Sequence, residues 1–197
     1  MGNPLDEAMA RYARGDDDAF AEIYDLASPA LYGFLLRLCR NEAQAEDLTH
    51  DTFMKMHLAR GIFRPGSEAL PWAYTIARNL FLDSTRSKKR AMVSLESERE
   101  DRGSDPGIPS PEAGADEVLE AGRLERKIEE VLAGLPESQA TAFRLLKQEG
   151  LSVAAAAAVL GATEAAVKLR AHRAYEALRA ALGDTVGAAE RSTRRSP

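Results

Sequence analysis

A polar, acidic stretch near the middle of the chain limits what the sequence can fold into. From Ser94 to Gly114 it contains three prolines and three glycines, and Leu95 and Ile108 are its only large apolar residues. Such a segment buries too little apolar surface to offset the entropy lost on ordering. We therefore expect two small domains, residues 1–92 and 117–183, joined by a flexible acidic linker over 93–116 and followed by a disordered tail over 184–197.

Both predicted domains have the composition of helices. Leu, Ala, Glu and Arg dominate, and the alternation typical of strands is absent, so we predict an all-α fold. Pro29 fits the first turn of a helix better than its interior, and Ser67 is a candidate N-cap. The predicted helices lie near residues 4–14, 17–27, 29–40, 42–60, 68–89, 117–133, 137–149, 153–160 and 164–182.

Composition and motif searches exclude several classes of protein. The single cysteine, Cys39, cannot form an internal disulfide or a multi-cysteine metal site, and the three histidines lack the spacing of metal ligands. No apolar run approaches the ~20 residues of a membrane span, and the N-terminus lacks a signal-peptide core. No set of residues suggests a catalytic nucleophile. We expect a cytoplasmic protein that is not an enzyme, takes no cofactor, metal or small-molecule substrate, and does not insert into membranes.

Charge is distributed in blocks along the chain. Residues 1–59 carry a net charge of −6, residues 60–90 carry +5 and residues 91–120 carry −7, while the whole chain carries −5. A basic block between two acidic ones is typical of a local nucleic-acid-binding face rather than of a uniformly basic surface.

Residues 151–173, LSVAAAAAVLGATEAAVKLRAHR, have the spacing of a helix-turn-helix. Ser152 and Thr163 are candidate N-caps, Gly161 permits a left-handed turn, and Ala157 and Val167 occupy the positions where the two helices meet. The alternative is an alanine-rich hairpin that only packs. The pattern predicts that the second helix presents side chains to base edges and phosphates. These residues are Thr163, Glu164, Ala165, Lys168, Leu169, Arg170, His172 and Arg173.

Two further motifs lie in the first predicted domain. In NEAQAEDLTHDTFMKMH, Leu48, Thr52 and Met56 share one helix face, while Asp47 and Asp51 lie one turn apart on another. That acidic face is either merely solvated or binds a partner. The following stretch, FRPGSEALPWAYTIARNLFLDSTRSKKR, interleaves basic and aromatic residues. This pattern suits single-stranded nucleic acid, although an ordinary basic helix end has it too.

Taken in order, these motifs resemble the extracytoplasmic-function (ECF) group of the bacterial sigma-70 family. The resemblance covers roughly residues 16–90 and 120–182. It implies an alternative sigma factor that binds core RNA polymerase and directs promoter-specific initiation, with region 2 in the first domain and region 4 in the second. The implied partners are the clamp region and flap of core polymerase, promoter DNA, and an anti-sigma factor, commonly membrane-bound.

The resemblance also assigns residues to roles. It places core polymerase binding on Glu46, Asp47, Leu48, Asp51 and Phe53. It places −10 recognition and melting on Arg64, Ser67, Trp72, Arg78, Asn79, Arg86, Lys88 and Lys89. The helix-turn-helix residues named above would read the −35 element.

The sequence alone leaves other functions open. A helix-turn-helix regulator that acts without being a polymerase subunit would predict one nucleic-acid face and a dimerisation helix, whereas this sequence has two separated basic segments and no heptad seam. A small helical enzyme would require a convergent set of catalytic residues. The linker is either a soluble spacer or an acidic strand that threads the positive channel of the polymerase.

Overall fold

The computed structural model describes residues 3–95 and 116–193, and these residues form helices and turns with no strand among them. The prediction of an all-α fold is confirmed. The chain divides into two compact units, unit 1 (Met1–Ile108) and unit 2 (Pro109–Pro197). The division falls inside the segment predicted as a linker, of which residues 96–115 lie outside the described part of the chain.

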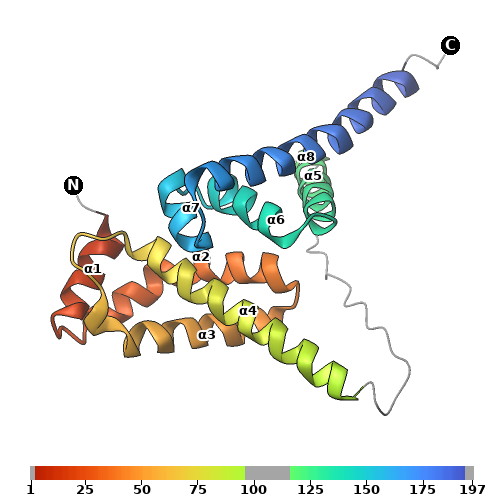
Figure 1. Cartoon of the computed structure of the whole chain (residues 1–197). Helices are drawn as coiled ribbons and strands as arrows, with labels where there is room; N and C mark the ends of the chain where they lie inside the picture. The colour runs from red at the N-terminus through yellow and green to blue at the C-terminus, as the bar shows by residue number, and fades with distance from the viewer. Residues whose placement is uncertain (1–2, 96–115, 194–197) are drawn as a thin grey trace. The chain divides into compact units, whose positions relative to one another are not determined.

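Unit 1 is built around one long helix. The helix α2 (Ala19–Cys39) packs against α1 (Pro4–Ala13), α3 (Glu42–Leu58) and α4 (Ala69–Leu95) (Figure 1). A short 3-10 turn, η1 (Arg60–Ile62), follows α3. The most deeply buried large side chains come from all four α-helices, so the unit has a hydrophobic core of its own. They include Met9, Ile23, Leu31, Phe34, Met56 and Tyr74.

The prediction of a helix break at Pro29 is wrong, because α2 continues through this residue. Proline lacks an N–H, so the carbonyl of Asp25 loses its helical partner. Asp25 and Pro29 are both exposed, and water can satisfy that carbonyl. Ala27 and Leu31 on the opposite side are fully buried, so packing holds the helix together across the proline.

Unit 2 is organised around its last helix. The helix α8 (Glu164–Thr193) packs against α5 (Asp116–Ala133), α6 (Glu137–Phe143) and α7 (Val153–Leu160). Leu132, Ala140, Ala174 and Leu178 form a buried cluster where α5, α6 and α8 meet. Ala155, Ala156 and Ala157, the middle of the alanine run in α7, are buried, as expected of a helix that approaches its neighbours closely.

Two elements of unit 2 differ from the sequence expectation. A single helix was expected over 137–149, but α6 ends at Phe143 and residues Arg144–Gln148 form a π-helical turn, η2. The side chain of Arg144 is buried there, and its guanidinium donates to Glu129 on α5 at 2.6 Å. The helix α8 runs on to Thr193, through most of the segment expected to be a disordered tail.

Candidate polymerase and nucleic-acid interfaces

The helix α3 has an acidic outer side and an apolar inner side. Asn41 caps its first turn by accepting a hydrogen bond from the Gln44 backbone N–H at 2.8 Å. Leu48, Thr52 and Met56, which share one face of the helix, are all buried. The acidic side chains that the sequence singled out, Glu46, Asp47 and Asp51, are exposed. Those carboxylates are therefore available to a partner.

Two residues predicted to bind core polymerase lie inside unit 1 instead. Leu48 and Phe53 are buried. The ring of Phe53 meets Phe20 edge-on at 6.2 Å between centroids and lies 4.7 Å from the ring of Tyr24. Both side chains hold α3 against the rest of the unit, so their contribution to a partner contact would act through the shape of α3.

An exposed apolar stripe, which was not among the predicted site residues, continues the acidic face of α3. Met54, Leu58 and Ile62 are 52%, 78% and 76% exposed. Asp47, Asp51, Met54 and Leu58 recur at helical spacing and so share one side of α3. The signal that marks this stripe is large apolar residues on a helix whose core face is already filled by others.

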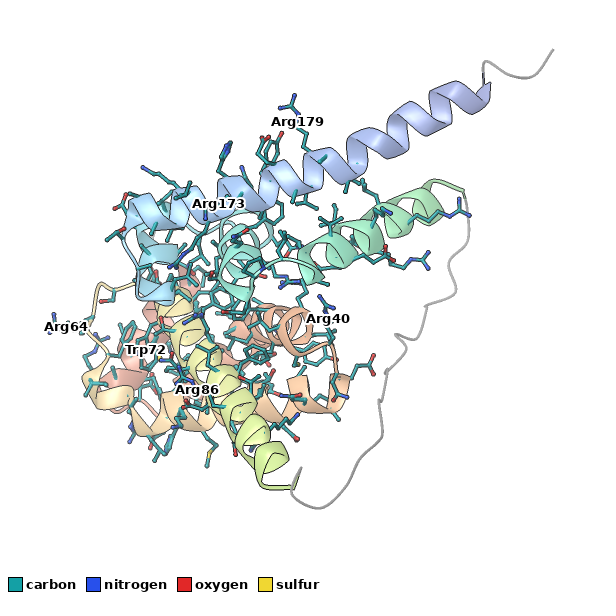
Figure 2. All side chains as sticks on the ribbon, turned by 45° about the vertical axis from the view of Figure 1, so that its right-hand side comes forward. Arg40, Arg64, Trp72, Arg86, Arg173 and Arg179 are labelled. Carbon is teal, nitrogen blue, oxygen red and sulfur yellow. The ribbon has the colours of Figure 1, made fainter. Side chains whose placement is uncertain are left out.

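A tight turn precedes α4 and carries the residues expected to meet the −10 element. The Ser67 N–H donates to the Arg64 carbonyl at 3.0 Å, and Gly66 has a φ of +87°. Proline followed by such a glycine is typical of a type II turn. Arg64 and Ser67 are exposed, and Figure 2 shows Arg64 on this loop, with Trp72 at the start of α4.

The helix α4 presents only part of its predicted basic face freely. Asn79 is exposed, whereas Trp72 is partly covered and its ring lies 5.2 Å from that of Phe63. Arg78 is partly covered, with its Nε atom in the interior. The other basic side chains lie toward the C-terminal half of the helix. Arg86 lies 3.6 Å from Asp83, Lys88 donates to Gln44 on α3 at 2.9 Å, and the side chain of Lys89 lies outside the described part.

The helix-turn-helix of unit 2 has the local geometry that its sequence predicted. Ser152 accepts from the Ala155 N–H at 3.1 Å, and Thr163 accepts from the Ala166 N–H at 3.2 Å, so each residue caps its helix. Gly161 adopts the left-handed conformation at a φ of 58° and ends α7. Val167 is fully buried between the helices.

The outer side of α8 carries the residues predicted to meet the −35 element. All of them are exposed except Arg170, which is partly covered. Lys168, His172 and Tyr175 follow one another along this side at helical spacing. Tyr175, 52% exposed, lies just beyond the end of the helix-turn-helix motif at Arg173 and so was not among the predicted residues. Figure 2 shows Arg173 and, farther along the helix, Arg179.

Three groups of unit 1 have pKa values raised above their ordinary range. Burial raises the pKa of the Cys39 thiol, which donates to the Leu35 carbonyl at 2.9 Å. Burial, reinforced by Glu42 and Glu46, raises the pKa of Tyr32. The pKa of Arg60 is raised first by its hydrogen bond with Asp17 and then by Tyr12. None of these groups is a residue predicted to bind DNA or polymerase.

Within residues 3–95 and 116–193, no group of three or more His, Cys, Asp or Glu side chains is placed to hold a metal ion. None of the helices in that part of the chain is both long and apolar enough to cross a bilayer.

Comparison with known proteins identifies both units. The family description "Sigma-70 region 2" matches residues 23–91, and "Sigma-70, region 4" matches residues 125–178. RNA polymerase sigma factor CarQ of Myxococcus xanthus is 35% identical over 89% of this chain and 96% of its own length. ECF RNA polymerase sigma factor SigW of Bacillus subtilis is 30% identical over 91% and 97% of the two chains.

Solved structures agree with these matches. The sigma factor RpoE of Bartonella quintana, in complex with the anti-sigma factor NepR, superposes with a TM-score of 0.69 at 28% identity and covers 83% of this chain and 96% of RpoE. CnrH, in complex with the cytosolic domain of CnrY, shares the fold with a TM-score of 0.66 at 24% identity, over 92% and 99% of the two chains.

The chain belongs to the sigma-70 family of RNA polymerase sigma factors. Within that family it is an alternative sigma factor of the ECF group, which directs transcription initiation and is not an enzyme. The prediction from sequence is confirmed, and a helix-turn-helix regulator that acts outside the polymerase is not favoured.

Proposed function

We propose that the two units divide promoter recognition, with unit 1 binding core polymerase and acting on the −10 element while unit 2 reads the −35 element. The observation that carries this proposal is the two-sided character of α8. Val167, Ala174 and Leu178 are buried against unit 2, while Lys168 and His172 point to solvent. A helix held rigidly on one side and free on the other is what insertion into a major groove requires.

The contact with core polymerase is proposed for the outer side of α3. The exposed carboxylates of Glu46, Asp47 and Asp51 suit basic side chains on the clamp, and Met54 and Leu58 add apolar area on the same side. Charge then guides the encounter, and apolar burial adds affinity. A second contact, with the flap of the polymerase, is assigned to unit 2.

The −10 element is proposed to meet the Arg64–Ser67 turn and the exposed side of α4. A base flipped out of the duplex needs a site that holds it, because unstacking costs a few kcal/mol. Asn79 offers both a donor and an acceptor to a base edge, and Arg64 and Arg86 can contact phosphates. Trp72 and Arg78 are partly covered, which supports a role in shaping this surface.

The −35 element is proposed to meet the first half of α8. Thr163 begins the helix, so free N–H groups there can face a phosphate. Lys168 and His172 lie one turn apart and are assigned to base edges, with Leu169 beside them. Arg173 is assigned to the phosphate backbone, which contributes affinity without sequence preference.

We further propose that the protein works in the cytoplasm and is held inactive by an anti-sigma factor. Support comes from RpoE of Bartonella quintana, which was solved with the anti-sigma factor NepR. The exposed apolar stripe Met54, Leu58 and Ile62 offers such an inhibitor a surface that overlaps the proposed polymerase contact. An inhibitor that covers this stripe would exclude the polymerase.

Reconstituted transcription tests the proposed function directly. The purified chain is mixed with core polymerase and a library of promoters with randomised −35 and −10 elements. We expect transcripts that start at a fixed distance from a two-part consensus, and none with core polymerase alone. Duplex binding by the free chain with no specific initiation would overturn the proposal in favour of an independent regulator.

A further inference from the structure

The loop between α3 and α4 is fastened at both ends by residues from the beginning of the chain. It includes the exposed turn from Arg64 to Ser67, to which we assign contact with the −10 element. Its two ends meet α1 and the turn that follows α1. Both α1 and that turn precede residue 23, where the match to Sigma-70 region 2 begins.

The first fastening is a hydrogen bond at the start of α4. The carboxylate of Asp6, in the first turn of α1, accepts from the backbone N–H of Ala69 at 2.7 Å. Ala69 is the first residue of α4 and is fully buried. A helix begins with N–H groups that lack partners within the helix, and a negative charge there is stabilising. Asp6 therefore caps α4 from 63 residues away.

The second fastening lies at the other end of the loop. The Arg60 guanidinium forms an ion pair with Asp17 and lies over the ring of Tyr12, 5.1 Å from its centroid. Phe63, the next buried residue, packs against Trp72. The loop is thus held at Arg60 where it begins and at Ala69 where it ends, so the position of its exposed turn depends on both contacts.

We propose that Asp6 is a positioning residue for −10 recognition: by capping α4, it sets where the Arg64–Ser67 turn and the first turns of α4 stand relative to the promoter. The inference rests on the proposed function of this loop. Asp6 makes no contact with DNA in this scheme. It acts through the backbone of Ala69, and Arg60 with Asp17 plays the corresponding part at the opposite end.

The test uses the full chain in holoenzyme and compares three variants. Asp6→Ala removes the cap. Asp6→Asn keeps a side-chain oxygen that can accept from Ala69. Glu7→Ala removes the same charge from the same first turn of α1, but Glu7 is exposed and is the matched control. The readouts are core affinity, thermal stability, and the ratio of open complexes on consensus and single-substitution −10 elements, on duplex and pre-melted templates.

We expect Asp6→Ala to reduce discrimination between −10 sequences about fivefold. This factor corresponds to the free energy that an ordinary N-cap contributes. Core affinity and −35 preference should stay unchanged, Asp6→Asn should restore most of the discrimination, and Glu7→Ala should match the wild type. A purely structural role would lower thermal stability while leaving the −10 ratio unchanged. That result, or equal effects of Asp6→Ala and Glu7→Ala, would overturn the inference.

Two more variants keep the test decisive. If Asp6→Ala fails to form holoenzyme, Asp17→Ala removes the acceptor of Arg60 at the other end of the loop and should also reduce −10 discrimination. Unchanged discrimination would count against the inference, because lost negative charge alone would strengthen DNA binding to all sequences. Arg64→Ala probes the loop itself. If it leaves open-complex formation unchanged, the proposed contact of the loop with the −10 element fails. If it weakens open complexes while Asp6→Ala leaves −10 discrimination unchanged, only the role of Asp6 fails.

Discussion

Unit 1 and unit 2 present their candidate DNA-facing residues by different structural means. In unit 2 local contacts set the geometry of the helix-turn-helix. Thr163 caps α8 by accepting a hydrogen bond from the Ala166 N–H, and Gly161 makes the turn. In unit 1 the loop before α4 is closed by Asp6 and Asp17, which lie 63 and 43 residues away from their partners. The position of α8 in unit 2 is set by residues next to it in sequence. The loop before α4 in unit 1 instead depends on α1 and the turn that follows α1.

The largest expected effect would show that affinity for core polymerase depends on unit 1. Changing Asp47 and Asp51 together to lysine should abolish holoenzyme formation, because one close charge pair lost at an interface costs roughly 2–5 kcal/mol. Both side chains are exposed, so the unit should stay helical by circular dichroism. Asp25→Lys, an exposed charge reversal on α2, is the control. Unchanged core affinity in the double variant would remove α3 from the proposed interface.

The next prediction tests whether the two units are stable independently. Glu129→Ala should destabilise unit 2 by about 3 kcal/mol, because it leaves the buried guanidinium of Arg144 without its carboxylate. Gln148 would lose its 3.0 Å hydrogen bond to the same carboxylate. Chemical denaturation should show unit 2 unfolding at a lower denaturant concentration than unit 1. Core binding through unit 1 should persist. A single transition shifted as a whole would mean that the units unfold together.

A third prediction distinguishes two roles along the reading helix of unit 2. Lys168→Ala should relax preference at one or two −35 positions by about 2 kcal/mol, since a base contact discriminates by roughly that amount. Arg173→Ala should weaken all promoters alike and reduce the salt slope by about one unit. Selection from a randomised −35 library and salt titration measure these effects. An unchanged −35 consensus with Lys168→Ala would mean that the helix enters the groove in another orientation.

In unit 1 the residue proposed to contact a base edge, as Lys168 does in unit 2, is Asn79. Asn79→Ala should weaken open complexes on duplex promoters about fivefold to tenfold, the effect of one or two lost hydrogen bonds. Pre-melted promoters should be affected less, because their bases are already unpaired. The rate of open-complex formation on matched duplex and bubble templates measures the difference. Equal loss on both would indicate a general defect of unit 1 rather than a contact made during melting.

The smallest expected effect concerns the Cys39 thiol at the end of α2. Its raised pKa means that folding favours the neutral thiol, so this part of the stability is present at neutral pH and is lost as the pH rises above about 8.5, where the unfolded thiol ionises. Wild type should therefore lose stability relative to Cys39→Ala above that pH. Urea unfolding of both proteins between pH 7 and 10 measures the difference, and parallel curves would contradict the assignment.

Local signals were enough to predict much of the fold and the reading helix of unit 2. The caps at Ser152 and Thr163, the turn at Gly161 and the inward position of Val167 depend on residues within a few positions of one another. Such patterns are fixed by backbone chemistry and are visible in sequence. The break predicted at Pro29 was wrong because packing on the buried side of α2 outweighed the local preference.

The candidate surfaces of unit 1 were harder to predict because they depend on contacts between distant residues. Leu48 and Phe53 belong to the same motif as Asp47 and Asp51, but the packing of α3 against α2 and α4 decides which of them face solvent. The exposed position of Leu58 follows from the same packing. The hydrogen bond between Asp6 and Ala69 joins residues 63 positions apart, and no periodicity or spacing in the sequence predicts it. Ser67, the expected cap, lies in the preceding turn, and its capping role stays a prediction.

The distant cap on α4 bears on how chimeric sigma factors should be constructed. A swap limited to the matched family segment, residues 23–91, would transfer the Arg64–Ser67 turn without Asp6, Tyr12 and Asp17, and the recipient would keep its own residues at those positions. The transplanted loop would then sit against foreign anchors, and its promoter preference would become that of neither parent. An exchange that begins before Asn3, the N-cap of α1, carries loop and anchors together.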